Sequence, residues 1–210
     1  MTDRLSLIQW LSPAFPTGGF AYSHGLEWAI DAGQIRDAAA LTDWLTTILR
    51  HGAGWQDAVL LCHALDPSAD LDALTDLAAA LQPSSERLQE TLDQGTALAQ
   101  AVSALRDTPL KPRPLPIALG EAARGLALPP EEIAAHYLHA FASNLVSGAV
   151  RFVPLGQNAG QRALHALHPV IADVAARATG VTLDDLGTAA LWADMAAMRH
   201  ETMQVRIFRT

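Results

Sequence analysis

The chain has 210 residues, of which half are hydrophobic and only 17% are charged. A chain of this length and composition can bury the core of one domain, which excludes a mostly disordered protein. Its 22 acidic residues outnumber its 14 lysines and arginines, giving a formal net charge of -8. Because nucleic-acid affinity comes largely from basic side chains on phosphates, we expect no nucleic-acid partner.

Neither a membrane anchor nor an export signal is visible in the sequence. The longest apolar stretch, Ala134 to Val153, is interrupted by polar residues that include His136 and Arg151, so we expect no membrane span. The N-terminal segment Met1 to Trp10 carries charged side chains and no long apolar run. Cys62 is the only cysteine, so no disulfide can form within the chain and the expected location is the reducing cytoplasm.

The first half of the chain is rich in Ala and Leu and is divided into helical segments by Pro and Gly. Gly33 can end one of these helices and Asp37 can cap the next. The predicted helices in this half cover 4–11, 22–32, 38–50, 55–65 and 70–81.

The second half continues in the same way after Thr108 to Pro116, a Pro-rich segment that we expect to be a rigid linker or an exposed loop. The run Pro129 to Glu132 is typical of a helix start, because proline suits the first position and carboxylates suit the positive end of the helix dipole. Pro169 is expected to kink a helix over 159–178. The predicted helices cover 87–105, 117–125, 130–152, 159–178 and a last one through Trp192.

The last residues, His200 to Thr210, alternate apolar and polar side chains and are expected to be extended. No strand pattern alternates with the helices, which argues against an α/β nucleotide-binding fold. The predicted fold class is therefore all-α, a single-domain helical bundle of roughly eight to ten helices.

The residue pattern argues against two kinds of catalytic chemistry, nucleotide hydrolysis and a Ser–His triad. Gly18-Gly19 is not followed by Lys and Ser/Thr at the P-loop spacing, so we expect no GTPase or ATPase activity of the chain's own. Ser23 and His24 are neighbours, and adjacent helical residues cannot form a catalytic triad. We predict no catalytic residue and no enzyme activity.

A metal site is the main alternative. Glu132, His136 and His139 share one face of a predicted helix, and His165 and His168 are spaced i, i+3, as in half of a carboxylate–histidine site. Apolar residues alternate with these histidines, and a histidine is more often a surface or core residue than a ligand. We therefore expect no metal and no cofactor, while a helical metal-binding protein using the His136/His139 and His165/His168 pairs stays open.

The loop Ser12 to Gly25 combines Pro, Gly and aromatic residues to an unusual degree. Prolines fix φ and glycines permit positive φ, so such a loop can hold one defined irregular shape. The pattern is equally consistent with a connection that packs Phe15, Phe20 and Tyr22 into the core and with a docking surface.

Three separated motifs resemble one family, the urease accessory protein UreF. They are S-P-A-F-P-T-G-G-F-A-Y-S-H-G-L-E at Ser12 to Glu27, R-F-V-P-L-G-Q at Arg151 to Gln157, and M-R-H-E-T-M-Q-V-R-I-F-R-T at Met198 to Thr210. Their order, their spacing and the length of the chain agree with the family, so the resemblance covers essentially the whole sequence. Thr210 and Ile207 depart from its usual serine and leucine, and both changes are conservative.

The resemblance implies an all-α protein that forms a homodimer and does no chemistry itself. It implies a nickel-insertion chaperone, an adaptor that bridges UreD (also called UreH) and the GTPase UreG and engages apo-urease during maturation of the urease nickel centre. It further implies a helical UreF-like domain over 1–195 and a C-terminal partner-docking tail over 196–210.

The resemblance also implies roles for particular residues of the first and third motifs. In the family the C-terminal end is associated with UreD binding, and Tyr22 and Glu27 fall on the dimer or UreG-facing surface. The expected partner-binding residues are Tyr22, Glu27, His200, Glu201, Arg206, Phe208 and Arg209.

Overall fold

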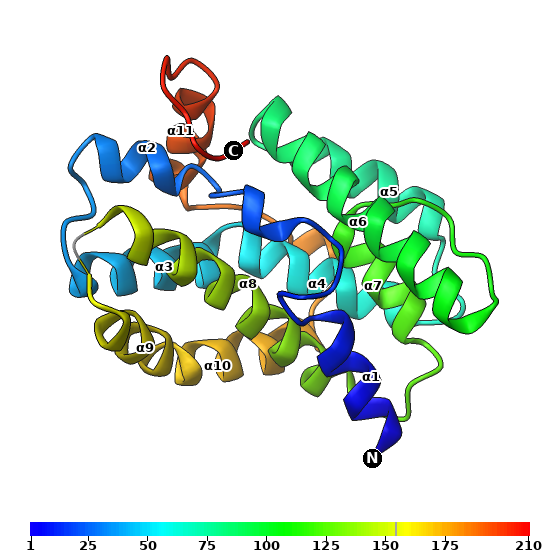
Figure 1. Ribbon diagram of the computed structural model, residues 1–210. Coiled ribbons are helices and arrows are strands. Elements are labelled where there is room, and N and C mark those ends of the chain that lie inside the picture. Colours follow the sequence, from blue (N-terminus) through cyan, green and yellow to red (C-terminus); the bar gives the residue numbers. More distant parts are fainter. Residues whose placement is uncertain (154) are drawn as a thin grey trace.

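The computed structural model describes residues 1–153 and 155–210, and these residues form helices and loops with no strand. The predicted all-α class is confirmed (Figure 1). The α-helices are α1 (Thr2–Trp10), α2 (Leu26–Asp31), α3 (Ala38–His51), α4 (Ala53–Leu65), α5 (Leu71–Ala80), α6 (Ser85–Arg106), α7 (Leu115–Ala123), α8 (Pro130–Phe152), α9 (Gln157–Ala166), α10 (His168–Ala178) and α11 (Leu191–His200). Two short 3-10 helices, η1 (Gly19–Ala21) and η2 (Leu183–Asp185), complete the order.

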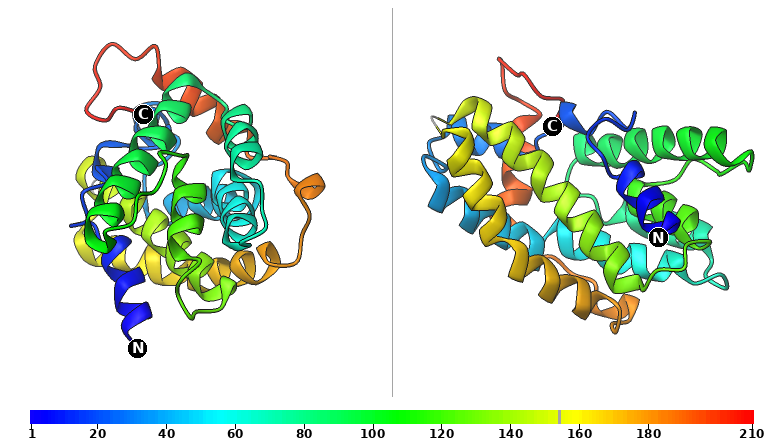
Figure 2. Two further views of the ribbon diagram at one scale, coloured as in Figure 1. Left: turned by 90° about the vertical axis from the view of Figure 1, so that its right-hand side faces the viewer. Right: turned by 60° about the horizontal axis from the view of Figure 1, so that its bottom comes forward.

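Helices α4 and α8 form the centre of the bundle and pack against each other. Helices α3 and α10 pack on one side of this pair. On the other side α7 packs against α4, and α6 packs against α7 (Figures 1 and 2). Close approach of α7 to α4 depends on Gly120, because a Cβ there would lie 2.5 Å from that of Ala64. The large buried side chains of these helices, Leu60, Leu61 and Leu138 among them, exclude water from the core.

The helices begin where the sequence places capping groups. Asp37 accepts a hydrogen bond from Ala40 N at 2.9 Å, and Asp70 accepts from Asp72 N and Ala73 N. Ser84 accepts from Arg87 N at 3.2 Å and starts α6. These side chains satisfy backbone donors that the first turn of a helix leaves unpaired.

Several predicted segments differ from the structure in detail. The predicted helix over 22–32 begins only at Leu26, and the last predicted helix, through Trp192, begins only at Leu191. The Pro-rich segment is not simply an exposed linker, because Arg113 is buried and donates to Leu71 O at 2.8 Å. The helix over 159–178 is interrupted at Leu167 and not merely kinked at Pro169. Pro169 has no N–H, and its ring would clash with the carbonyl of the residue four positions earlier, so the helix restarts as α10.

The C-terminal residues fold back onto the bundle. Helix α11 continues through His200, so it crosses the expected domain boundary between residues 195 and 196. Residues 201–210, here called the strap, leave α11, loop outward and return to the start of α2 (Figures 1 and 2). Backbone hydrogen bonds hold the return, from Arg209 N to Ala21 O and from Ser23 N to Thr210 O, both 2.8 Å. The division at 195/196 stays a prediction.

None of the helices formed by the described residues combines the length and the hydropathy needed to cross a lipid bilayer.

Candidate partner-binding surface

The loop between α1 and α2 is shaped by its contact with α11. His24 and Gly25 both have positive φ, 56° and 75°, a conformation that costs little only for glycine. A Cβ at Gly25 would lie 2.5 Å from Ala197 N. The start of α2 and the side of α11 therefore meet backbone to backbone, which brings the first and third motifs together.

Glu27 forms the floor on which the strap rests. Its carboxylate accepts hydrogen bonds from Ile207 N at 2.8 Å and from Phe208 N at 3.0 Å. The side chain is buried and lies in the first turn of α2, where the helix dipole favours a negative charge. One carboxylate thus satisfies two strap donors that would otherwise be unpaired.

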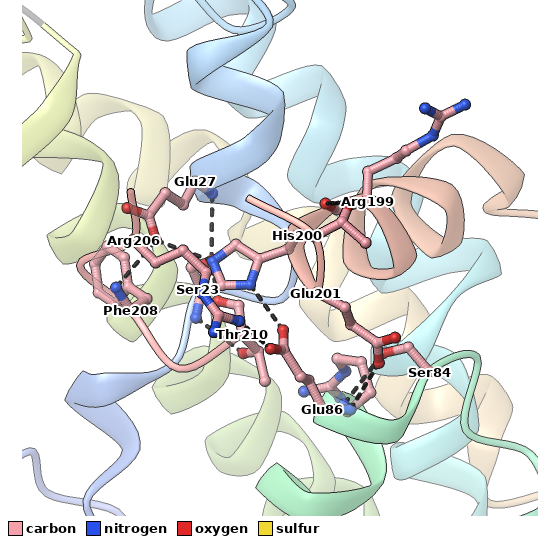
Figure 3. A network of polar contacts seen from close by, with 12 residues as sticks. Ser23, Glu27, Ser84, Glu86, Arg199, His200, Glu201, Arg206, Phe208 and Thr210 are labelled. Atoms are coloured by element: carbon pink, nitrogen blue, oxygen red, sulfur yellow. Dashed lines mark hydrogen bonds and ion pairs between the residues drawn. The ribbon is translucent and has the colours of Figure 1, made fainter. Parts of the chain in front are cut away.

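His200, at the end of α11, is fully buried with a relative exposure of 0%. Its Nε2 lies 3.0 Å from Glu27 Oε2, and its Nδ1 lies 2.8 Å from Glu86 Oε2 (Figure 3). His200 therefore links α11 to the first turns of both α2 and α6.

Glu86 and Glu201 extend this network at the start of α6. Glu86 also pairs with Arg206 of the strap. Glu201 accepts from Ser85 Oγ at 2.7 Å and from Glu86 N at 3.0 Å, and these hydrogen bonds lower the pKa of the Glu201 carboxyl. Glu201 thus acts as a second cap for α6 supplied from another part of the chain.

Glu90 joins the strap to the interior of the bundle. Its Oε2 accepts from Thr210 Oγ1 at 2.8 Å, and its Oε1 lies 2.7 Å from His24 Nε2. Burial alone would raise the pKa of Glu90, but the positive charge of Arg87 and the contact with His24 outweigh it and hold the pKa at about 2. Burial and the same arginine lower the pKa of His24.

Phe208 is the apolar anchor of the strap. Its ring is buried and meets the ring of Phe152 edge to face, with 5.2 Å between centroids. Nearby, Tyr22 is buried under the strap and donates to Asp93 Oδ2 at 3.0 Å. The strap is thus held by one aromatic contact and several charged ones.

The residues of α2, α6 and α11 and of the loop before α2 that contact the strap are here called the strap seat. All seven expected partner-binding residues lie in the strap or in this seat, but their exposure differs. Tyr22, Glu27, His200 and Phe208 are buried within the chain, while Arg206 and Arg209 are exposed and Glu201 is half-buried. The buried members shape the strap through contacts within the chain. Their assignment as partner-binding residues stays a prediction.

Sequence reasoning missed the residues that complete the strap and its seat. They are Ser23, Glu86, Glu90 and Thr210. Ser23 and Thr210 lie within the first and third motifs, and the signal for Glu86 was the run Ser84-Ser85-Glu86, which places an acidic residue in the first turn after a helix cap. Nothing in its spacing pointed to a histidine 114 residues away.

An apolar surface covers the outer side of this assembly. Trp192 is 69% exposed and Val205 is 81% exposed. Other large apolar side chains on α11 and the strap are also exposed: Leu191, Met195, Met198 and Ile207. Exposed apolar side chains of this size, carried by one helix and the segment that directly follows it, typically mark a protein interface. We call these six residues the α11–strap face.

A cavity of about 110 Å³ lies beneath the loop between α1 and α2. Its lining mixes aromatic residues such as Trp10 and Phe141 with the buried groups Asp57, His24 and Glu90. Tyr137 Oη donates to Asp57 Oδ2 at 2.6 Å. Burial raises the pKa of Asp57 to about 6, although the hydrogen bond from Tyr137 opposes the shift.

The histidines of the metal-binding alternative do not form one four-residue site. His136 turns toward Glu132, 3.9 Å away, whereas His168 stacks with His139 and His165. Among the described residues, no three His, Cys, Asp or Glu side chains stand in positions that would hold a metal ion. Burial and the neighbouring histidines lower the pKa of His139. Burial also raises the pKa of the Cys62 thiol to about 11, which leaves it unreactive.

Comparison with known proteins gives one consistent result. A model of the UreF family matches residues 35–168. The chain is 62% identical over 206 residues to a protein of Cereibacter sphaeroides (strain KD131) called urease accessory protein UreF, with 98% of each chain covered. Proteins of the same name from Paracoccus denitrificans (strain Pd 1222) and Jannaschia sp. (strain CCS1) are 53% and 50% identical, covering 99% and 98% of this chain and 96% and 94% of theirs.

Proposed function

The chain belongs to the UreF family of urease accessory proteins, and we propose that within urease maturation it is an adaptor that bridges UreD (UreH) and the GTPase UreG. The family expected from the three sequence motifs is thereby confirmed. In this proposal the protein works as a homodimer in the cytoplasm and presents the assembled accessory proteins to apo-urease for nickel insertion.

The observation that supports the proposal most directly is the α11–strap face. Trp192 and its apolar neighbours are exposed, yet the segment that carries them is held in one shape by the carboxylates of Glu27, Glu86 and Glu90. A surface that is already shaped loses less entropy when it binds. We propose that UreD docks on this face, which begins on α11 at Leu191 and not only at residue 196.

The adaptor adds no nucleotide chemistry of its own in this proposal. The chain carries no Gly-rich loop followed by Lys and Ser/Thr, which a nucleotide-binding site of the P-loop type would need. UreG supplies the GTPase. Phe20 lies in η1, just before Tyr22, and is 66% exposed. Its exposure supports a second contact surface, for UreG or for the second copy of the chain.

The test uses purified full-length protein with UreD, and UreG added in a second step. We expect Trp192→Asp to lower co-elution with UreD at least tenfold, because a charge would replace a large apolar side chain within the docking face. Leu5→Asp is the matched control, since Leu5 is 58% exposed on α1, away from the face. Equal UreD capture by both variants would rule out this docking face.

A surface substitution tests the docking better than removal of residues 203–210. Truncation would leave Glu27 and Glu90 without the strap groups Phe208 N and Thr210 Oγ1, and an unpaired buried carboxylate destabilises the fold. Loss of UreD capture by Trp192→Asp with an unchanged circular dichroism spectrum would separate docking from folding.

A further inference from the structure

Three exposed histidines lie where α8, α9 and α10 meet, away from the side of α8 on which Phe152 contacts the strap residue Phe208. His139 is in the middle of α8, His165 is in the last turn of α9, and His168 is the first residue of α10. Helices α9 and α10 pack against α8 (Figures 1 and 2). The fold therefore brings residues 26 or more positions apart in the sequence to one patch of surface.

The break between α9 and α10 decides this arrangement. Helix α9 ends at Ala166 and α10 restarts at His168, because Pro169 cannot continue the first helix. His165 and His168 thus lie on either side of a corner, with 4.9 Å between their ring centroids. His168 is also 5.6 Å from the ring centroid of His139, so it is the shared neighbour of the other two.

These separations suit imidazoles that share one metal ion. With nitrogen–metal bonds of about 2.0–2.1 Å, two imidazoles bound at angles between octahedral and tetrahedral have ring centres roughly 4.5–5.2 Å apart. The His165–His168 separation is inside this range, and His139 must approach His168 by a few tenths of an ångström. Carboxylate-rich sites suit calcium or magnesium, whereas imidazole suits zinc, copper and nickel.

The polar contacts among the described residues do not involve the rings of these three histidines. Among the residues that the structure describes, none of the three rings makes a side-chain hydrogen bond or an ion pair, in contrast to His63, which bonds to Val181 O, and to His200. All three are exposed. They can therefore change rotamer without breaking a contact that stabilises the bundle.

We propose that His139, His165 and His168 form a surface site for a divalent transition-metal cation, completed by water. The rings meet at tilted and edge-on angles of 49° and 73°, so they do not converge on one point until the exposed side chains rotate. Binding thus orders the patch rather than filling a preformed cage. The site goes beyond the adaptor function and differs from the expectation, made from the sequence, that the chain holds no metal.

The first experiment is calorimetric titration of the full chain with zinc chloride and, separately, with nickel chloride. We expect one ion per chain at micromolar affinity, and at least a tenfold loss of affinity in His168→Gln, because His168 neighbours both other ligands. His51→Gln is the matched control, since His51 is also an exposed histidine near a helix end but belongs to no cluster. Absence of binding, or equal binding by both variants, would overturn the proposal.

A second readout keeps the proposal testable if His168→Gln disturbs the start of α10. Ring resonances of His139, His165 and His168 in the unsubstituted protein should all broaden when paramagnetic nickel is added, while those of His63 and the buried His200 stay sharp. A response confined to His165 and His168, with His139 unchanged, would contradict a site shared by the three helices.

Discussion

The centre of the bundle and the strap seat are held together by different forces. Helices α4 and α8 meet mainly through apolar side chains such as Leu61 and Leu138, with a buried hydrogen bond from Tyr137 to Asp57 between them. The strap is held by carboxylates that each face several donors, with Glu27 accepting from Ile207 N and Phe208 N. The first kind of contact stabilises the whole fold, whereas the second fixes the position of one segment.

The largest test of this difference is a cavity in the apolar centre. Leu138→Ala should lower the free energy of unfolding by about 3 kcal/mol, because a fully buried leucine on α8 is removed from the core. Denaturant unfolding followed by tryptophan fluorescence measures it. Leu105→Ala, at an exposed position of α6, is the control and should change stability by less than about 0.5 kcal/mol.

The second test removes the floor of the strap. Glu27→Ala leaves Ile207 N, Phe208 N and His200 without their acceptor, a local cost of about 2 kcal/mol. Hydrogen exchange should therefore quicken roughly tenfold or more at the amides of residues 207 and 208 and stay unchanged in α8. Glu131→Ala, at the exposed start of α8, should leave the strap protected. Equal acceleration in α8 and the strap would show that the two regions are not independent.

The third test distinguishes the two regions by pH. The folded pKa of Asp57 is raised to about 6 from 3.8, so its contribution to stability is complete below the unfolded pKa and is lost as the pH rises through about 6. Glu90 has the opposite sign, because its folded pKa is held at about 2. Its contribution is present above the unfolded value of 4.5 and is lost as the pH falls toward 2.

Asp57→Asn should therefore make the free energy of unfolding depend less on pH between pH 5 and pH 7.5. Between pH 5 and pH 7.5 the unsubstituted protein should lose about 1 kcal/mol more than Asp57→Asn, since asparagine can still accept the hydrogen bond from Tyr137. Thermal or denaturant unfolding at the two pH values measures the difference. Parallel curves for the two proteins would mean that Asp57 titrates as it does in the unfolded chain.

The sequence by itself determined the class of fold and the family. Composition and the spacing of Pro and Gly predict helices because these effects act within a few residues, and Asp37 and Asp70 cap the helices that they precede. The motifs Ser12 to Glu27 and Met198 to Thr210 also led to the region where the seat lies. The all-helical class and the family are confirmed.

Only the tertiary structure decided what those motif residues do. Burial of Glu27 and His200, and the contacts of His200 with Glu27 and Glu86, depend on α2, α6 and α11 meeting at one point (Figure 3). The meeting of His139 with His168 likewise depends on where α8 passes the corner between α9 and α10. Helical periodicity reports which side of one helix is apolar, but it carries no information about which distant helix will cover that side, because that choice is made by packing the whole chain.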